Sequence, residues 1–146
     1  MIIKIFIIIA FVLIQSCGVF NRIPSSQSNA CDILDHKSSW KRAVKKTSKK
    51  WGVSPALQLA FIKTESNFRA RAKTPRKFFL GIIPNGRISS AYGYAQALNG
   101  TWDWYKKDTG NRNASRTNFY DATDFIGWYV TQTNKKLKIS KSNLSL

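Results

Sequence analysis

Apolar side chains recur at helical spacing in four stretches of the chain, and short polar segments separate these stretches. Gly52 follows the first stretch and Gly110 follows the third, and glycine favours a helix end. Ser54 and Pro55 open the second stretch and favour a helix start. The pattern therefore predicts four helices, which begin near residues 40, 55, 99 and 118.

Between the second and third predicted helices, two β-prone runs at residues 78–83 and 87–90 flank the sequence Pro84-Asn85-Gly86. Asn-Gly between two such runs is the strongest short-range signal for a hairpin. We therefore expect two short strands joined by a turn at residues 84–86. The predicted fold class is α+β, mainly α, with one small β-hairpin after the second helix.

The N-terminal residues predict export. Lys4 precedes an apolar run at residues 5–14, which is shorter than the roughly 20 residues that span a bilayer but fits a signal peptide. Residues 13–17, Leu-Ile-Gln-Ser-Cys, resemble a bacterial lipobox, with Gln15 where a small residue is commoner. We expect a signal peptide at residues 1–16 and a lipid on Cys17, which would anchor the chain as a membrane lipoprotein of the bacterial cell envelope. In a Gram-negative cell this would be the outer membrane, facing the periplasm. Ordinary secretion and an uncleaved anchor are the alternatives.

Residues 17–36 are predicted to form the lipidated cysteine and a polar tether, and residues 37–146 a single folded domain. The chain has two cysteines, Cys17 and Cys31. A lipid on Cys17 leaves Cys31 alone, whereas a merely secreted chain could join the two in a small disulfide loop. Neither case gives a disulfide scaffold.

The chain carries 24 lysines and arginines against 7 acidic residues, a formal net charge of +17. Such a balance usually suggests a nucleic-acid binder, but export puts nucleic acid out of ordinary reach. The expected partners are cell-wall peptide carboxylates and envelope phosphates, besides the membrane that holds the lipid. We expect the basic stretch at residues 41–50 to form the solvated face of the first helix and to steer the protein toward such a polymer.

Glu65 is the only glutamate of the chain, and it falls in the last turn of the second predicted helix. Leu57 and Phe61 lie on the same stripe of that helix, so the carboxyl is aimed toward the interior or a cleft. Cleavage of a glycosidic bond needs a carboxylic acid that protonates the leaving oxygen. The alternative is a surface glutamate at a frayed helix end.

Two short motifs and the order of the helices point to one family. Glu65-Ser66-x-Phe68 matches the acid motif of soluble lytic transglycosylases and goose-type lysozymes, and residues 93–96, Gly-Tyr-Ala-Gln, match their Gly-Leu-Met-Gln motif with conservative changes. A Thr101-Trp102 helix and an aromatic-rich helix follow at the expected distances. The chain thus resembles this family over roughly residues 51–129, which implies a lysozyme-like fold.

The resemblance implies cleavage of the β-1,4 bond between N-acetylmuramic acid and N-acetylglucosamine in the glycan strands of peptidoglycan. Glu65 would protonate the glycosidic oxygen and then accept a proton from the muramoyl 6-hydroxyl, which closes a 1,6-anhydro ring. One carboxyl suffices for this reaction, whereas ordinary glycosidases need a pair. A hydrolytic muramidase and a noncatalytic peptidoglycan-binding lipoprotein are the alternatives.

The resemblance also implies the neighbours of the acid. Ser66 is expected near the acid or the substrate, and Gln96 is expected in the cleft with the backbone of Gly93 or Tyr94. Tyr92 and Tyr94 are candidates to stack on sugar rings, or else they pack in the core. The sole histidine, His36, excludes a histidine-rich metal site, and we expect no metal and no cofactor.

Relatives usually continue to a third motif, which carries a tyrosine that closes the cleft opposite the acid. After Tyr129 this chain offers no aromatic residue and no glycine before Leu146. We therefore expect a domain that is short at its C-terminus, with weak or no activity alone unless a second copy or a partner chain completes the cleft. Otherwise Tyr92, Tyr94 or Tyr129 must do the work of the missing tyrosine.

Overall fold

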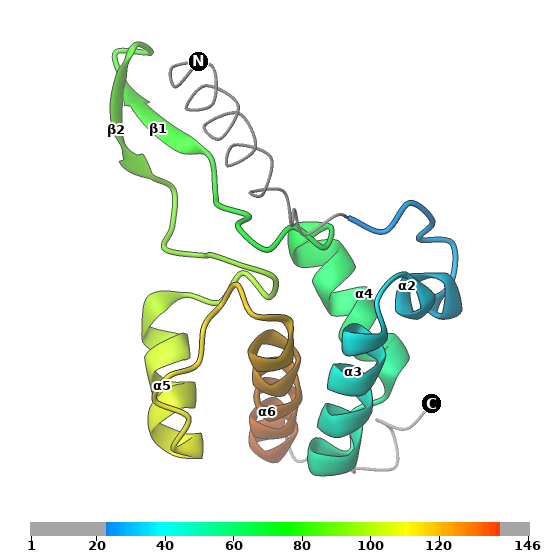
Figure 1. Cartoon of the computed structure of the whole chain (residues 1–146). Coiled ribbons are helices and arrows are strands. Elements are labelled where there is room, and N and C mark those ends of the chain that lie inside the picture. Colours follow the sequence, from blue (N-terminus) through cyan, green and yellow to red (C-terminus); the bar gives the residue numbers. More distant parts are fainter. Residues whose placement is uncertain (1–22, 138–146) are drawn as a thin grey trace, which may run out of the picture.

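The computed structural model describes residues 23–137 as a helical body from which one β-hairpin projects (Figure 1). The fold is α+β and mainly α, as the sequence pattern predicts. The elements in chain order are α2 (Ala30–His36), α3 (Ser38–Trp51), α4 (Pro55–Ser66), β1 (Arg76–Phe79), β2 (Ile83–Arg87), α5 (Asn99–Thr109) and α6 (Phe119–Leu137).

Helix α6 lies between α3 and α5 and supplies much of the core (Figure 1). Its first three turns are buried on several sides, and α3 packs tightly against it at Gly127. A Cβ atom at Gly127 would lie 2.5 Å from the Trp51 ring and 2.7 Å from the Thr47 methyl group. The glycine therefore lets the two helices pack closer than any side chain would permit.

A cluster of aromatic rings joins α3 and α6 to the residues that follow α4 and to those that precede α5. Trp40 of α3 is buried, and its ring lies parallel to that of Phe119 with 4.1 Å between the centroids. Phe68 stacks on Trp40 at 5.4 Å, and Tyr94 meets both Trp40 and Phe119 edge to face. This ring cluster fixes the segments that follow α4 and precede α5, and both of these segments shape the candidate site.

The hairpin exists where the sequence predicts it, but its turn is not at residues 84–86. Phe79 pairs with Ile83, so the chain reverses at residues 80–82, where Leu80 and Gly81 have φ angles of 51° and 76°. Gly86 also has a left-handed φ of 70°, but it lies within β2 at the register irregularity. The Asn-Gly pair thus serves a β-bulge, which needs the same left-handed backbone as a turn.

The tether predicted for residues 17–36 ends earlier than expected. Asn29 caps α2 by accepting a hydrogen bond from the Asp32 N–H at 2.9 Å, and Ile33 buries its side chain in the core. Helix α2 packs against α3 and α4, so residues 30–36 belong to the folded domain. Cys31 is exposed on this helix. Cys17 and the predicted signal peptide lie outside the described residues.

Asp124 of α6 joins three parts of the body through its carboxylate. It accepts hydrogen bonds from the Trp51 indole at 2.8 Å and the Tyr105 hydroxyl at 2.8 Å, and it pairs with Lys50 at 2.9 Å. Burial and the charge of Asp124 raise the pKa of Tyr105, which keeps its hydroxyl protonated as a donor. The carboxylate is therefore a structural one.

We expect Asp124→Ala to lower the free energy of unfolding by about 2–4 kcal/mol, because it leaves the partly buried Trp51 and Tyr105 donors without their acceptor. Urea unfolding measures the change. Asp103→Ala is the matched control, since Asp103 makes only an exposed pair with Lys106 on α5 and its loss is expected to cost less than about 0.5 kcal/mol. Equal losses for the two variants would contradict a structural role for Asp124.

Candidate active site

Helix α4 carries Glu65 next to its C-terminal end. The Ser54 side chain accepts a hydrogen bond from the Leu57 N–H at 3.3 Å, and Pro55 occupies the first turn, as the sequence predicts. The helix ends at Asn67, which takes a left-handed conformation and donates its N–H to the Lys63 carbonyl at 2.9 Å. Both ends of the helix are therefore fixed, and with them the position of the acid.

The residues after Glu65 fold back sharply. Asn67 and Phe68 have φ angles of 48° and 59°, an uncommon pair for residues other than glycine. The Phe68 ring, buried against Trp40, holds this turn in place. The acid motif thus has a structural reason for its phenylalanine, which anchors the end of α4.

Ser66 contributes to the same turn rather than to the pocket. Its side chain is buried, and its hydroxyl donates to the Ile62 carbonyl one turn earlier at 3.1 Å. The expectation that Ser66 contacts the acid or the substrate is therefore not met, because its place on α4 directs it to the core while Glu65 faces the other way.

The segment at residues 92–98 forms the wall opposite α4. Gly93 has a φ of 83°, and its N–H donates to the Ala72 carbonyl at 3.0 Å. A Cβ at this position would lie 2.1 Å from the Arg116 carbonyl oxygen, so only glycine fits. The Gln96 amide nitrogen donates to the carbonyls of Ala72 and Gly93 at 3.0 and 2.8 Å. These bonds lock the wall, and they leave the Gln96 amide oxygen as an acceptor.

Arg116 braces this wall from behind, a role that no sequence pattern indicates. Its guanidinium donates to the Ala97 carbonyl and to the Asn99 side chain, each at 2.9 Å. Its own carbonyl accepts the Tyr94 N–H at 3.1 Å. The loop before α6 thereby fixes both ends of the segment at residues 94–99.

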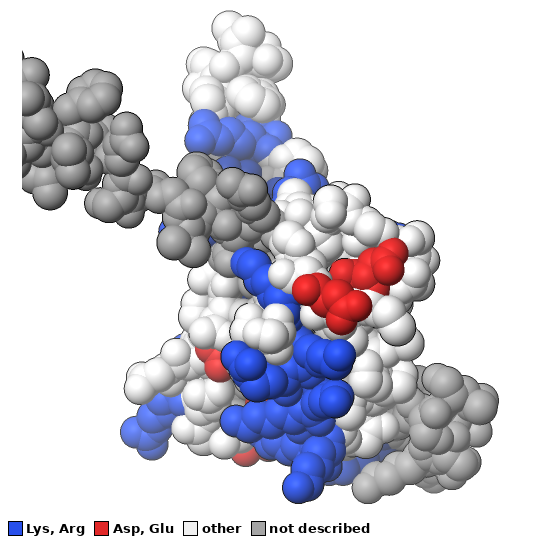
Figure 2. Space-filling view, turned by 45° about the vertical axis from the view of Figure 1, so that its right-hand side comes forward, with Lys and Arg blue, Asp and Glu red and all other residues white. Residues whose placement is uncertain are grey.

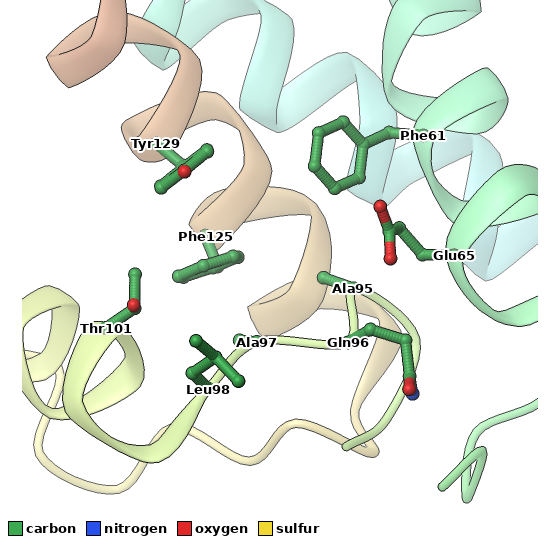
Figure 3. A pocket seen from close by; sticks show the side chains of 9 residues that line it. All are labelled: Phe61, Glu65, Ala95, Gln96, Ala97, Leu98, Thr101, Phe125 and Tyr129. Carbon is green, nitrogen blue, oxygen red and sulfur yellow. The ribbon is translucent and has the colours of Figure 1, made fainter. Parts of the chain in front are cut away.

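A pocket opens between α4, this wall, α5 and α6 (Figure 3). The Glu65 carboxyl points toward it from α4, one turn after Phe61 (Figure 3). Tyr129 and Phe125 face it from α6, with their rings stacked at a centroid distance of 5.7 Å. Its lining consists of Phe61, Glu65, Ala95, Gln96, Ala97, Leu98, Thr101, Phe125 and Tyr129.

Glu65 differs from every other carboxyl side chain of the protein. All seven lie within residues 23–137, and each of the six aspartates has a hydrogen-bond or ion-pair partner there. No side chain or backbone group of the described residues pairs with Glu65, which is exposed at the pocket. No aspartate lines this pocket. Glu65 is therefore a carboxyl without a structural task, placed alone at a pocket wall.

The three candidate tyrosines have different positions. Tyr94 is buried in the ring cluster, so its ring is not available to a sugar. The same burial raises the pKa of the Tyr94 hydroxyl to about 12. Tyr92 is not part of the pocket lining, and Lys73 and Arg116 lie over its ring at 5.4 and 5.5 Å. Tyr129 is 38% exposed and lines the pocket. Of the three, only Tyr129 shares the pocket with Glu65.

Some predicted features fall outside what the structure describes. The signal peptide at residues 1–16, the lipid on Cys17 and the chain after Leu137 lie outside the described residues. Among the described helices, none is long and apolar enough to cross a membrane. Within residues 23–137, no group of three or more histidine, cysteine, aspartate or glutamate side chains is arranged to hold a metal ion.

The fold is that of a helical, lysozyme-like domain with one small hairpin. Its pocket has one acidic side chain, and the residues between the hairpin and α5 form one wall of this pocket. The family described as the transglycosylase SLT domain matches residues 5–145, and the chain belongs to this family. No curated protein and no solved structure matches it. Membership implies a lytic transglycosylase-type activity on the glycan strands of peptidoglycan.

Proposed function

We propose that the protein is a peptidoglycan lytic transglycosylase in which Glu65 alone acts as acid and base. The observation that carries the proposal is the unpartnered Glu65 carboxyl at the pocket, with each aspartate engaged elsewhere in the described domain. A structural carboxylate would have a partner, as Asp124 and Asp108 do. A catalytic acid must instead stay free for the substrate.

The reaction needs no second carboxylate. Glu65 donates its proton to the glycosidic oxygen as the bond from C1 of N-acetylmuramic acid to that oxygen breaks. The muramoyl 6-oxygen then bonds to C1, and its proton passes to the Glu65 carboxylate, which restores the acid. No water enters, and the product is a 1,6-anhydromuramoyl end. The absence of any aspartate from the pocket lining favours this route over a glycosidase that uses two carboxyl groups.

The remaining pocket residues hold the sugar in place. Tyr129 and Phe125 both line the pocket with their rings stacked on each other, and such an aromatic surface suits contact with the apolar face of a sugar. The Gln96 amide oxygen is available to accept a hydrogen bond from a substrate N–H or O–H group, because the amide nitrogen is already occupied. Tyr129 is then the tyrosine that faces Glu65 across the pocket.

Release of soluble glycan fragments from purified peptidoglycan tests the proposal. The unmodified chain is expected to solubilise peptidoglycan with time, and Tyr129→Ala is expected to slow release while Tyr92→Ala changes it little, since only Tyr129 lines the pocket. Binding to peptidoglycan without any release would identify a noncatalytic binding protein instead.

The exposed face of α3 is strongly basic and is expected to strengthen binding to the cell wall. Figure 2 shows its side chains as a continuous cluster of lysines and arginines, contributed by Lys41, Arg42, Lys45, Lys46, Lys49 and Lys50. Only Lys41 and Lys50 of this face pair with a carboxylate among the described residues. The other charges are free to attract the anionic groups of the envelope.

We expect the double substitution of Lys45 and Lys46 by glutamine to weaken binding to peptidoglycan about threefold or more at low salt. It should also flatten the salt dependence, because at 0.1 M salt screens attraction between exposed charges that are more than about 10 Å apart. Sedimentation with purified peptidoglycan at increasing salt measures both effects. Glutamine at Lys135 and Lys136, near the end of α6, removes the same charge elsewhere and is the control. Equal weakening by both pairs would mean that net charge matters and the α3 face does not.

A further inference from the structure

The β-hairpin exposes an unusual amount of apolar surface. All residues from 75 to 88 are exposed, and no helix within residues 23–137 packs over them (Figure 1). Half of the large apolar side chains exposed in the described domain belong to this short segment. Their exposed fractions are 54% for Phe78, 58% for Phe79, 77% for Leu80, 77% for Ile82, 54% for Ile83 and 61% for Ile88. Contiguous apolar surface of this kind marks an interaction site.

The turn of the hairpin is apolar although it lies at the end of the hairpin farthest from the helical body (Figure 1). Leu80 adopts a left-handed φ of 51°, a conformation that glycine or asparagine takes more readily. Turns in water are usually built from glycine, asparagine, aspartate and serine. Leucine and isoleucine on either side of Gly81 are therefore unfavourable for a turn that remains in water.

Apolar side chains lie on both faces of the ribbon. Successive residues of a strand point to opposite faces, so Phe78 and Phe79 of β1 cannot both contact a flat partner. The apolar turn continues around the end of the ribbon. A groove on a protein would cover one face, whereas a medium that surrounds the tip would cover both.

Basic residues encircle the hairpin directly behind its apolar tip. Arg76 of β1 lies opposite Arg87 of β2, although like charges in register repel each other, and Lys77 follows Arg76. No carboxylate within residues 23–137 pairs with any of these three. Figure 2 shows the result, an uncharged tip above a band of lysine and arginine. An apolar end followed by a cationic band complements lipid tails below anionic headgroups.

We propose that the tip of this hairpin, residues 78–83, inserts into the surface of a lipid bilayer that contains anionic headgroups, and that Arg76, Lys77 and Arg87 bind those headgroups. Figure 1 shows the helical body at the opposite end of the hairpin from the tip, so the body and the pocket that its helices line then stay in the aqueous layer beside the membrane. The proposal rests on the hairpin alone and does not depend on the catalytic role of Glu65.

A fluorophore that reports the polarity of its surroundings tests the insertion at the tip itself. It is attached to Leu80→Cys in the full chain with Cys17→Ala and Cys31→Ser, so that the label has one thiol. With vesicles of phosphatidylcholine and phosphatidylglycerol, the emission is expected to shift to shorter wavelength and to be quenched by a quencher carried on the lipid tails. Phosphatidylcholine vesicles alone are expected to give a much weaker response. Aspartate at Phe79 and Ile82 is expected to reduce the response roughly tenfold or more.

The same label at Lys49→Cys, on α3 and away from the hairpin, distinguishes insertion of the tip from attachment of the chain through other residues. This label is expected to stay in water. The proposal is overturned if both positions respond alike, or if Leu80→Cys does not respond to anionic vesicles. A response to peptidoglycan alone, to rising protein concentration without lipid, or a shifted emission already present in the free chain would also overturn it, and would identify the wall, a second copy or another segment of the chain as the occupant.

Discussion

Glu65→Gln is expected to reduce glycan release from peptidoglycan by at least about 100-fold while the fold stays unchanged. Glutamine has nearly the shape of glutamic acid but cannot give up a proton, and a general acid typically contributes about 10² to 10⁴ in rate. Glu65 acts in both proton transfers, so the loss affects protonation of the leaving oxygen as well as ring closure. The rate of release from purified peptidoglycan measures the effect.

The stability of the same variant separates a catalytic residue from a structural one. Glu65 has no partner among the described residues, so its replacement is expected to change the free energy of unfolding by less than about 0.5 kcal/mol. Asp103→Asn alters an exposed carboxylate outside the pocket and is expected to keep full activity. Unchanged release by Glu65→Gln would remove Glu65 from the mechanism.

Gly93→Ala is expected to have the largest effect on stability. An added Cβ would lie 2.1 Å from the Arg116 carbonyl oxygen and 2.7 Å from its carbon, and these are backbone atoms that cannot turn away. The left-handed φ of 83° adds strain for any residue with a side chain. We expect a loss of more than about 3 kcal/mol in the free energy of unfolding, and loss of glycan cleavage even where the chain still folds.

Gly100→Ala is the matched control for this variant. Gly100 lies in α5, and a Cβ there would meet nothing within 4 Å. Alanine in a helix is expected to be neutral or to stabilise by about 0.5–1 kcal/mol. Thermal or urea unfolding of both variants gives the comparison. If Gly93→Ala proved as stable as Gly100→Ala, the close packing of the wall against Arg116 would be wrong.

The helices could be predicted from the sequence because their boundaries depend on local chemistry. Ser54 and Pro55 begin α4, and Gly52 and Gly110 end α3 and α5, through backbone groups a few residues away. Glu65 could be predicted as a pocket residue for a similar reason. It follows Phe61 by four residues on one helix, so the two side chains lie on the same face. Phe125 and Tyr129 show the same four-residue spacing on α6.

Other features depend on contacts between distant segments and have no local signal. The left-handed backbone at Gly86 of the Asn85-Gly86 pair is compatible with either a turn or a bulge, so the register of the two strands decides which one forms. The residue type alone does not tell whether Tyr94 or Tyr129 lines the pocket. Tyr94 lies in the core because it packs against Trp40, which is distant in the sequence. The bracing of the wall by Arg116 joins residues about twenty positions apart, which no short motif encodes.

The most direct test of the proposed reaction is the mass of the glycan ends released from purified peptidoglycan in water enriched in heavy oxygen. A single-acid transglycosylase produces muramoyl ends that are lighter by one water than hydrolysed ends and carry no heavy oxygen, because the 6-oxygen of the sugar closes on C1. We predict this result for the unmodified chain and its loss in Glu65→Gln. Muramoyl ends of full mass that contain heavy oxygen would contradict the account and show that water, activated in this pocket, is the nucleophile.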